Sequence, residues 1–390
     1  MNINLRYFLL YYIFIYAGHA IYSTFVPVYF NDIGFTPMQI GTILSFGPFI
    51  AMLAQPFWGA MSDRARSKNM ILLLLIVGSA AAMLFVPLST AFPYVVAVIC
   101  IFTLFQTSIF AISDTITLEA IDKLRTGNFG HIRMGGTFGF AIMSLVFGFI
   151  AERQLGSMFP IYASIMALCF LLVLKFPHVA GHQTKGKGMS IGVILKNYKL
   201  MLYLGFNFIL QITLGFYYSF FPIYFRELGG DNVLLGWSMV ISSLAEVPFL
   251  LFADKIFKRV KIHYILIAAA IATTLRWILF YSIQSPLWAL PVQLLHGAMF
   301  IVLTVTMAAY INREVPKELK ASGQTFNGLL NLGVARIIGS LAGGIAITSF
   351  GLRNVFLYNA IIAVLSTLIF GLLVWRLQNR ERKDKRLRHP

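Results

Sequence analysis

Seven ionisable side chains interrupt the long apolar stretches of this sequence, and their types make them candidates for chemistry. They are His19, Asp114, Glu119, Glu246, Arg276, His296 and Arg336. A charged side chain at the centre of a membrane helix costs about 2.5–3.5 kcal/mol on insertion scales, so such residues are functional candidates by default. Because three acids stand against two arginines, we expect one carboxyl group to be neutral or matched by a histidine.

Three of these residues, Glu246, Arg276 and His296, fall in consecutive apolar stretches and near the middle of each. A proton-carrying site needs a carboxyl group whose proton affinity changes when a cation moves toward it or away from it. We therefore predict that Glu246 carries a proton and that Arg276 and His296 modulate its affinity. The alternative for each residue is a buried polar group that serves packing alone.

The composition indicates an integral membrane protein. The chain has 390 residues, of which 58% are hydrophobic and 12% charged, and its mean hydropathy is +0.79. Soluble domains are about 25% charged. The sequence contains no G-x-x-x-x-G-K-[ST] motif for ATP, no H-E-x-x-H metal motif and no CxxC pair. We therefore predict a protein that is not an enzyme and that holds neither cofactor nor metal.

Apolar stretches divided by charged residues, glycine and proline predict twelve membrane-spanning helices of about 20 residues. The predicted spans are 6–30, 38–61, 70–88, 94–120, 132–152, 158–175, 198–225, 234–254, 263–283, 287–311, 326–348 and 354–375. A polar, glycine-rich segment at 176–197 is typical of a flexible linker between two halves.

The lysines and arginines are distributed unevenly between the two sides of these spans. Of the 31, 26 fall on the side of the N-terminus and only Arg153, Arg226 and Arg353 fall on the other side. Because positive charge favours cytoplasmic loops, we predict that both termini are cytoplasmic and that the protein lies in the cytoplasmic membrane. The net charge of +17 is then a topology signal, with a basic tail near anionic lipid, and no nucleic acid is expected as a partner.

The two halves of the sequence repeat each other. Residues 27–34, PVYFNDIG, recur as PIYFRELG at 222–229, an offset of 195 that Gly41 and Gly236 keep. Repeats of six spans place two bundles side by side with the substrate between them. We therefore predict an all-α integral membrane protein with twelve transmembrane helices in two six-helix pseudo-symmetric bundles. Its predicted parts are the N-terminal bundle 1–175, the cytoplasmic linker 176–197, the C-terminal bundle 198–375 and the basic cytoplasmic tail 376–390.

The segment 59–68 between the second and third spans contains Gly59, Asp63 and Arg64 in that order. This order of glycine, acid and basic residues resembles the loop signature of the major facilitator superfamily of transporters. The resemblance implies a gating loop, in which Gly59 allows close helix contact, Asp63 accepts hydrogen bonds from a facing helix and Arg64 pairs with acids. The alternative is a positively charged loop with an incidental acid.

The segment 129–140, FGHIRMGGTFGF, resembles the start of the fifth span in the oligosaccharide–proton symporters, the lactose permease group, and in their nucleoside and phenylpropionate permease relatives. The resemblance implies that Glu119 and Arg133 form a charged pair that holds the substrate and that Phe140 supplies an aromatic platform. It also assigns the acid, arginine and histidine of the proton-coupling set to Glu246, Arg276 and His296.

Simpler roles compete with several of these assignments. Glu119 stands four residues before Lys123, so the two could form an interfacial ion pair. Arg133 could anchor a lipid phosphate. Arg336 could pair with Asp114 or Glu246, or serve packing alone.

The pocket predicted from the sequence is lined in addition by His19, Tyr22 and Asp114, with burial without a role as the alternative for His19. The sequence therefore predicts a monomeric secondary active transporter that moves a small organic solute, a sugar, a nucleoside or a small aromatic acid, by alternating access and proton symport. The first rival is a drug–proton antiporter, whose glycine-proline signature is missing between Gly135 and Gly148. A membrane sensor without transport and a membrane enzyme are the others.

Overall fold

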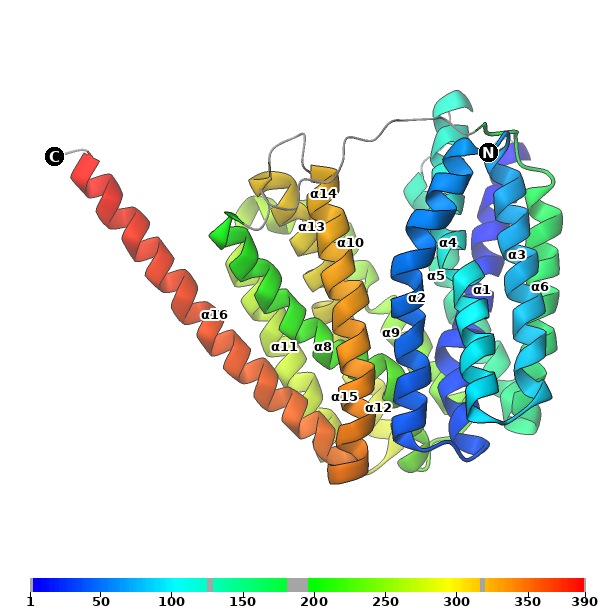
Figure 1. Cartoon of the computed structure of the whole chain (residues 1–390). Helices are drawn as coiled ribbons and strands as arrows, with labels where there is room; N and C mark the ends of the chain where they lie inside the picture. Colours follow the sequence, from blue (N-terminus) through cyan, green and yellow to red (C-terminus); the bar gives the residue numbers. More distant parts are fainter. Residues whose placement is uncertain (1–2, 125–128, 181–195, 316–319, 389–390) are drawn as a thin grey trace.

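The computed structural model describes residues 3–124, 129–180, 196–315 and 320–388, which form mostly α-helices (Figure 1). The helices of the first half are α1 (Ile3–Asp32), α2 (Pro37–Arg64), α3 (Lys68–Phe85), α4 (Phe92–Leu124), α5 (Phe129–Gln154) and α6 (Met158–Val173). Those of the second half are α8 (Tyr198–Glu227), α9 (Asn232–Leu244), α10 (Val247–Arg259), α11 (Ile262–Ser282), α12 (Pro286–Gln293), α13 (Val302–Glu314), α14 (Lys320–Gly328), α15 (Ala335–Phe350) and α16 (Leu352–Arg388).

Within the described residues, 11 helical segments are long and apolar enough to cross a membrane. One of them, Phe129–Val173, is 45 residues long and holds two of the predicted spans. These two spans are α5 and α6, which are separated only by the 3-10 turn η2 (Leu155–Ser157). Each of the twelve predicted spans therefore corresponds to helix in the structure, and the predicted all-α membrane fold is confirmed.

The repeated sequence forms the same turn in both halves. Gly34 and Gly229 have φ angles of 88° and 85°, a backbone conformation that favours glycine. Two residues later, Thr36 and Asp231 cap the N-termini of α2 and α9, and each side chain accepts a hydrogen bond from the backbone N–H three residues on. Residues 195 positions apart in these segments thus share their local structure as well as their residue types.

The two halves meet at the end of the molecule away from the chain termini. Gly41 of α2 lies against the backbone of Ser340 in α15, and Gly236 of α9 lies against the backbone of Ser144 in α5. Glycine has no Cβ, so these helix backbones can touch. Figure 1 shows α2 and α15 side by side at this end and diverging toward the end that holds both termini.

Three of the spans in the second half are interrupted within the described residues. A break at Ala245 and Glu246 separates α9 from α10, and two π-helices, η3 (Gly297–Ile301) and η5 (Leu329–Val334), follow α12 and α14. π-helical segments are rare and occur frequently at functional sites. Each interruption stands beside one of the ionisable residues named above.

The structure describes parts of two predicted boundary segments. The predicted linker begins with residues that pack on the first half: the rings of Phe8 and Phe176 stack at 4.0 Å, and Lys68 donates its backbone N–H to the Val179 carbonyl. Burial of these apolar side chains explains why this part of the segment packs on the first half. The linker residues 181–195 lie outside the described residues. The predicted tail is helical as far as Arg388, because α16 continues past the apolar stretch.

Candidate functional site

Glu246 stands at the break between α9 and α10. Pro248 in the first turn of α10 lacks the N–H that would bond the carbonyl four residues earlier, which favours an interruption of the helix at this point. Gly297 lies so close to the Ala245 carbonyl that a Cβ there would overlap it. The Glu246 side chain, 24% exposed, thereby reaches His296, with Oε1 lying 3.5 Å from Nε2.

His296 connects Glu246 to Arg276. Its Nδ1 lies 2.8 Å from Nη1 of Arg276, and its Nε2 lies 3.0 Å from the Tyr218 hydroxyl. Because a guanidinium can only donate, Nδ1 accepts, and the proton of the neutral ring is on Nε2, facing Glu246 and Tyr218. The structure thus brings the three residues of the predicted proton-coupling set into one chain of contacts.

Arg276 is fully buried, and its direct partners carry no charge. It donates to the side-chain oxygen of Gln293 and to the sulfur of Met299, and its Cζ lies 4.2 Å from the ring centroid of Tyr217. Among the described residues no carboxylate lies within ion-pair distance of Arg276. The nearest acid along the contacts is Glu246, which Arg276 reaches only through His296.

Arg336 is the second residue of α15, just beyond the π-helix η5, and lies over an aromatic ring. Its Cζ is 4.0 Å from the ring centroid of Tyr218, a cation–π contact. Its Nε is buried and has no hydrogen-bond partner among the described residues. The ion pairs that we considered for Arg336, with Asp114 or Glu246, are not found among the residues that the structure describes.

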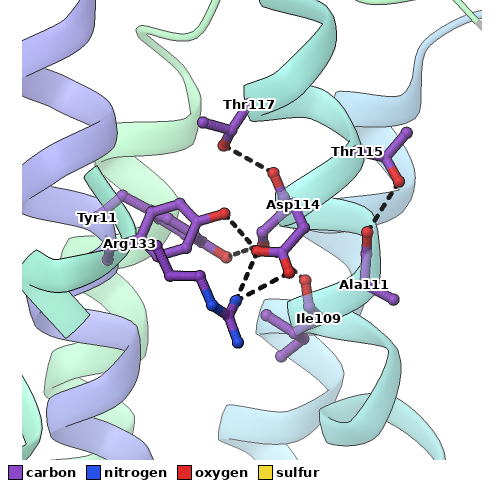
Figure 2. Close-up of polar contacts among 9 residues, drawn as sticks. Tyr11, Ile109, Ala111, Asp114, Thr115, Thr117 and Arg133 are labelled. Atoms are coloured by element: carbon purple, nitrogen blue, oxygen red, sulfur yellow. Dashed lines mark hydrogen bonds and ion pairs between the residues drawn. The ribbon is translucent and has the colours of Figure 1, made fainter. Parts of the chain in front are cut away.

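The charged pair of the first half is formed by Asp114 of α4 and Arg133 of α5 (Figure 2). Nη1 of Arg133 lies 3.1 and 2.9 Å from the two carboxylate oxygens, and Tyr12 of α1 donates to the same carboxylate at 2.5 Å. The side chains of Arg133 and Asp114 are 45% and 31% exposed. Both remain accessible to a solute.

The predicted pairing of Glu119 with Arg133 is wrong. Glu119 Oε1 lies 2.5 Å from Nζ of Lys68, and that nitrogen also lies 3.8 Å from Asp63. Glu119 follows Asp114 by five residues, well over one helical turn, so its side chain leaves α4 toward α3. The alternative partner Lys123 is exposed, and Glu119 lies at the end of the bundle, away from the Asp114–Arg133 pair.

The predicted gating loop differs in detail as well. Lys68, 4% exposed, supplies the cation beside Asp63, whereas Arg64 is exposed at the end of α2. A Cβ at Gly59 would meet open space, so the close helix contact that we expected there is absent in this conformation. At this end the helices of the two halves have diverged (Figure 1).

His19 and Phe140 lie together near the charged pair of the first half. Their ring centroids are 6.2 Å apart, and the His19 ring is 5.4 Å from that of Phe110. His19 Nδ1 is buried and has no hydrogen-bond partner within the described ranges. Tyr22 packs on Phe102 at 4.6 Å and so contributes chiefly to the wall of the first bundle.

The charge balance at the centre is the reverse of the one expected. Lys68 neutralises Glu119 at the bundle end, which removes one acid, and Arg133 adds a cation. The central arginines described are Arg133, Arg276 and Arg336, and the central carboxylates are Asp114 and Glu246. Arg133 also lies over Tyr16 of α1, with its Cζ 5.7 Å from the ring centroid.

Sequence reasoning did not find four residues of these clusters: Tyr12, Lys68, Tyr218 and Gln293. Gln293 precedes His296 by three residues, one helical turn, and that spacing of two polar residues in an apolar span was an available signal. The two tyrosines are indistinguishable in sequence from the many other aromatic residues of the spans. Lys68 counted only toward topology.

Comparisons with known proteins agree with this architecture. A sequence profile described as the MFS_1 like family matches residues 5–358. The maltose permease of Geobacillus stearothermophilus is 24% identical over 371 residues, 94% of each chain. The multidrug resistance protein MdtG of Serratia proteamaculans is 25% identical over 389 residues, 94% of this chain and 93% of its own.

Among solved structures, the nucleoside transporter NupG matches with a TM-score of 0.86 at 18% identity, over 96% of this chain and 99% of that chain. At that identity the likeness shows the fold alone. Fold and profile together define a multi-pass membrane protein of the secondary transporter class. The chain belongs to the MFS_1-like family of the major facilitator superfamily, which confirms the superfamily predicted from the sequence.

Proposed function

We propose that this transporter is a proton symporter that brings a small aromatic acid into the cell. The observation that carries the proposal is the chain of contacts from Glu246 through His296 to Arg276. Glu246 takes up and releases the proton, because it is the one carboxylate in this series of contacts and its side chain remains partly exposed. His296 and Arg276 set how strongly the proton is held.

Protonation of Glu246 couples to binding of an anion. While Glu246 is ionised, the Nε2–H of His296 faces a carboxylate, and the positive charge of Arg276 is balanced through the ring. Once Glu246 is protonated, Arg276 and Arg336 are left without an anion in their surroundings. An unbalanced charge inside a protein is costly, so the protonated site favours a negatively charged solute.

The substrate class follows from the same charges. Three arginines and two ionised carboxylates carry a total charge of +1, which protonation of Glu246 raises to +2 and a monoanion bound with the proton returns to +1. Arg336, whose Nε lacks a partner in the described structure, is the proposed carboxylate ligand. His19 and Phe140 offer flat surfaces for a ring, and the Asp114–Arg133 pair holds polar groups of the substrate. Of the three classes considered, only the aromatic acid is charged.

Coupling of the two ligands to movement has an electrostatic basis. A proton and a monoanion together leave the site with the same total charge as the empty carrier. A proton alone raises that charge by one and a monoanion alone lowers it by one, so the total charge is unchanged only when the site is empty or holds both ligands. We infer that the bundles 1–175 and 198–375 rock when the site is empty or holds both ligands.

The orientation is proposed from the distribution of Lys and Arg. With both termini in the cytoplasm and the protein in the cytoplasmic membrane as a monomer, the end where the halves diverge faces the cell interior. The conformation is then inward-facing. When this end closes, Gly59 is the place where α2 can approach its partner, with Asp63 and Arg64 beside it.

The test uses the purified full-length protein in liposomes with an imposed pH gradient, alkaline inside. The probes are radiolabelled 3-phenylpropionate, uridine and maltose. We expect the gradient to drive uphill uptake of 3-phenylpropionate. Glu246→Gln should lose uphill uptake but keep exchange of labelled for unlabelled solute, because its side chain mimics the protonated acid. The matched control is Glu227→Gln, at the exposed end of α8, which should behave like the wild type.

Each outcome tests a different part of the proposal. Wild-type accumulation by Glu246→Gln would reject its proton role. Gradient-driven uptake of uridine or maltose in place of 3-phenylpropionate would reject the aromatic acid and retain the proton coupling. Uptake that requires an acidic interior would identify the antiporter instead.

A further inference from the structure

A second polar pocket, of about 230 Å³, lies in the C-terminal half away from the transport site. It is formed where α8 and α11 begin and α13 ends, beside the continuing helix α16, at the end of the molecule that holds both chain termini (Figure 1). Its charged and strongly polar lining residues are Lys199, Lys261, His263, Arg313, Glu314 and Gln378. We propose that this pocket binds a phosphate-bearing anion, supplied by the headgroup of an anionic phospholipid.

The lining has the charge of an anion site. Three of these residues are lysine or arginine, and only Glu314 is acidic. The helix α11 begins at Ile262 in the pocket wall, and Lys261 before it provides no side-chain cap. The positive end of a helix dipole and its first N–H groups favour a phosphate. The guanidinium of Arg313 can hold two phosphate oxygens at once.

Size and surroundings favour a lipid headgroup. Pockets for drug-sized ligands have volumes of about 300–1,000 Å³, so this one suits a smaller group. The wall beyond the charged residues is apolar and includes Val374 of the outer helix α16. On the same helix, Leu372, two residues before Val374, and Trp375, the residue after it, are exposed. Acyl chains attached to a phosphate in the pocket can therefore lie along α16.

The equivalent place in the first half is filled differently. The offset of 195 relates His263 to Lys68 and Glu314 to Glu119. In the first half Lys68 bonds Glu119, and the chain after α6 turns back so that Val179 accepts from the Lys68 backbone. In the second half α16 continues straight as a helix, and the equivalent place is left as a cavity lined by excess positive charge.

The test is native mass spectrometry of the full-length protein, which counts bound lipids. The probes are dioleoylphosphatidylglycerol, with dioleoylphosphatidylcholine as the lipid control and glycerol 3-phosphate as the soluble phosphate. We expect one phosphatidylglycerol to be retained in preference to phosphatidylcholine. Lys261→Gln with Arg313→Gln should weaken retention about tenfold or more, as loss of charged hydrogen bonds predicts. Lys255→Gln with Lys258→Gln, exposed and outside the pocket, should leave it unchanged.

Glu314→Gln provides a change of opposite sign. It removes the one acid of the lining and should tighten phosphatidylglycerol binding, an effect that damage to the fold would not produce. Equal retention by the wild type and the Lys261/Arg313 variant would overturn the proposal, as would equal retention of the two lipids. Displacement of the lipid by glycerol 3-phosphate would retain the phosphate site and overturn its assignment to lipid.

Discussion

The two halves of the molecule hold arginine in different ways. In the first half, Arg133 is 45% exposed and contacts both oxygens of Asp114. In the second half, Arg276 is fully buried among neutral partners, and the only carboxylate of its cluster lies beyond a histidine. The first cluster is balanced in itself. In the second, Glu246 offsets the charge of Arg276 only while it is ionised, so a proton can change the state of the cluster.

The backbone of the second half, like its charge balance, is less rigidly fixed than that of the first half. Within the described residues, the spans that supply Asp114 and Arg133 are continuous helices, whereas Glu246 stands at a helix break. A continuous helix fixes its side chains rigidly, which suits recognition. A break or a π-turn leaves room for rearrangement, which suits a group that must gain and lose a proton. The comparison assigns substrate recognition to the first cluster and coupling to the second.

The largest expected effect that tests this assignment is that of Asp114→Asn. Arg133 would lose a bidentate partner and Tyr12 a charged acceptor, so both uphill uptake and exchange should fall about tenfold to a hundredfold. Glu246→Gln, by contrast, should retain exchange. Both rates are measured in proteoliposomes, with Asp32→Asn at the exposed end of α1 as the control. Exchange by Asp114→Asn at the wild-type rate would remove the distinction between the clusters.

A smaller effect is expected from Gly297→Ala, which tests the packing of the helix break. The added methyl would meet the Ala245 carbonyl, and overpacking of this kind costs about 1–3 kcal/mol. Gly205→Ala is the matched control, because open space surrounds that position in α8. Thermal unfolding in detergent should show a lower midpoint for the first variant only. The equivalent position of the first half holds Phe102, so this close contact is specific to the second half.

The smallest effect is expected from Tyr218→Phe. It removes the hydroxyl next to His296 but keeps the ring beneath Arg336, so the loss should be that of one neutral hydrogen bond, about 0.5–1.5 kcal/mol. Tyr12→Phe, which removes a bond to a carboxylate, should reduce exchange more. Parallel exchange assays compare the two variants, and a larger effect at Tyr218 would contradict this order.

The sequence by itself determined the fold and the set of groups in the second half. Membrane spans depend on the length and composition of continuous segments, which are local properties, so all twelve could be located. The repeat at an offset of 195 anticipated the matched turns at Gly34 and Gly229. Glu246, Arg276 and His296 could be grouped because an ionisable side chain inside a membrane requires a partner, and few partners were available.

Only the tertiary structure decided which partners meet. Arg133 binds Asp114 and Glu119 binds Lys68, a choice that depends on how helices are rotated, and one residue along a helix turns a side chain by about 100°. That exchange of partners reversed the central charge balance, because it moved Glu119 out of the site in which Arg133 remains. The cavity beside Lys261 also depends on the tertiary structure. It lies where α16 continues as a helix past the second bundle, and no local pattern of residues encodes that path of the chain.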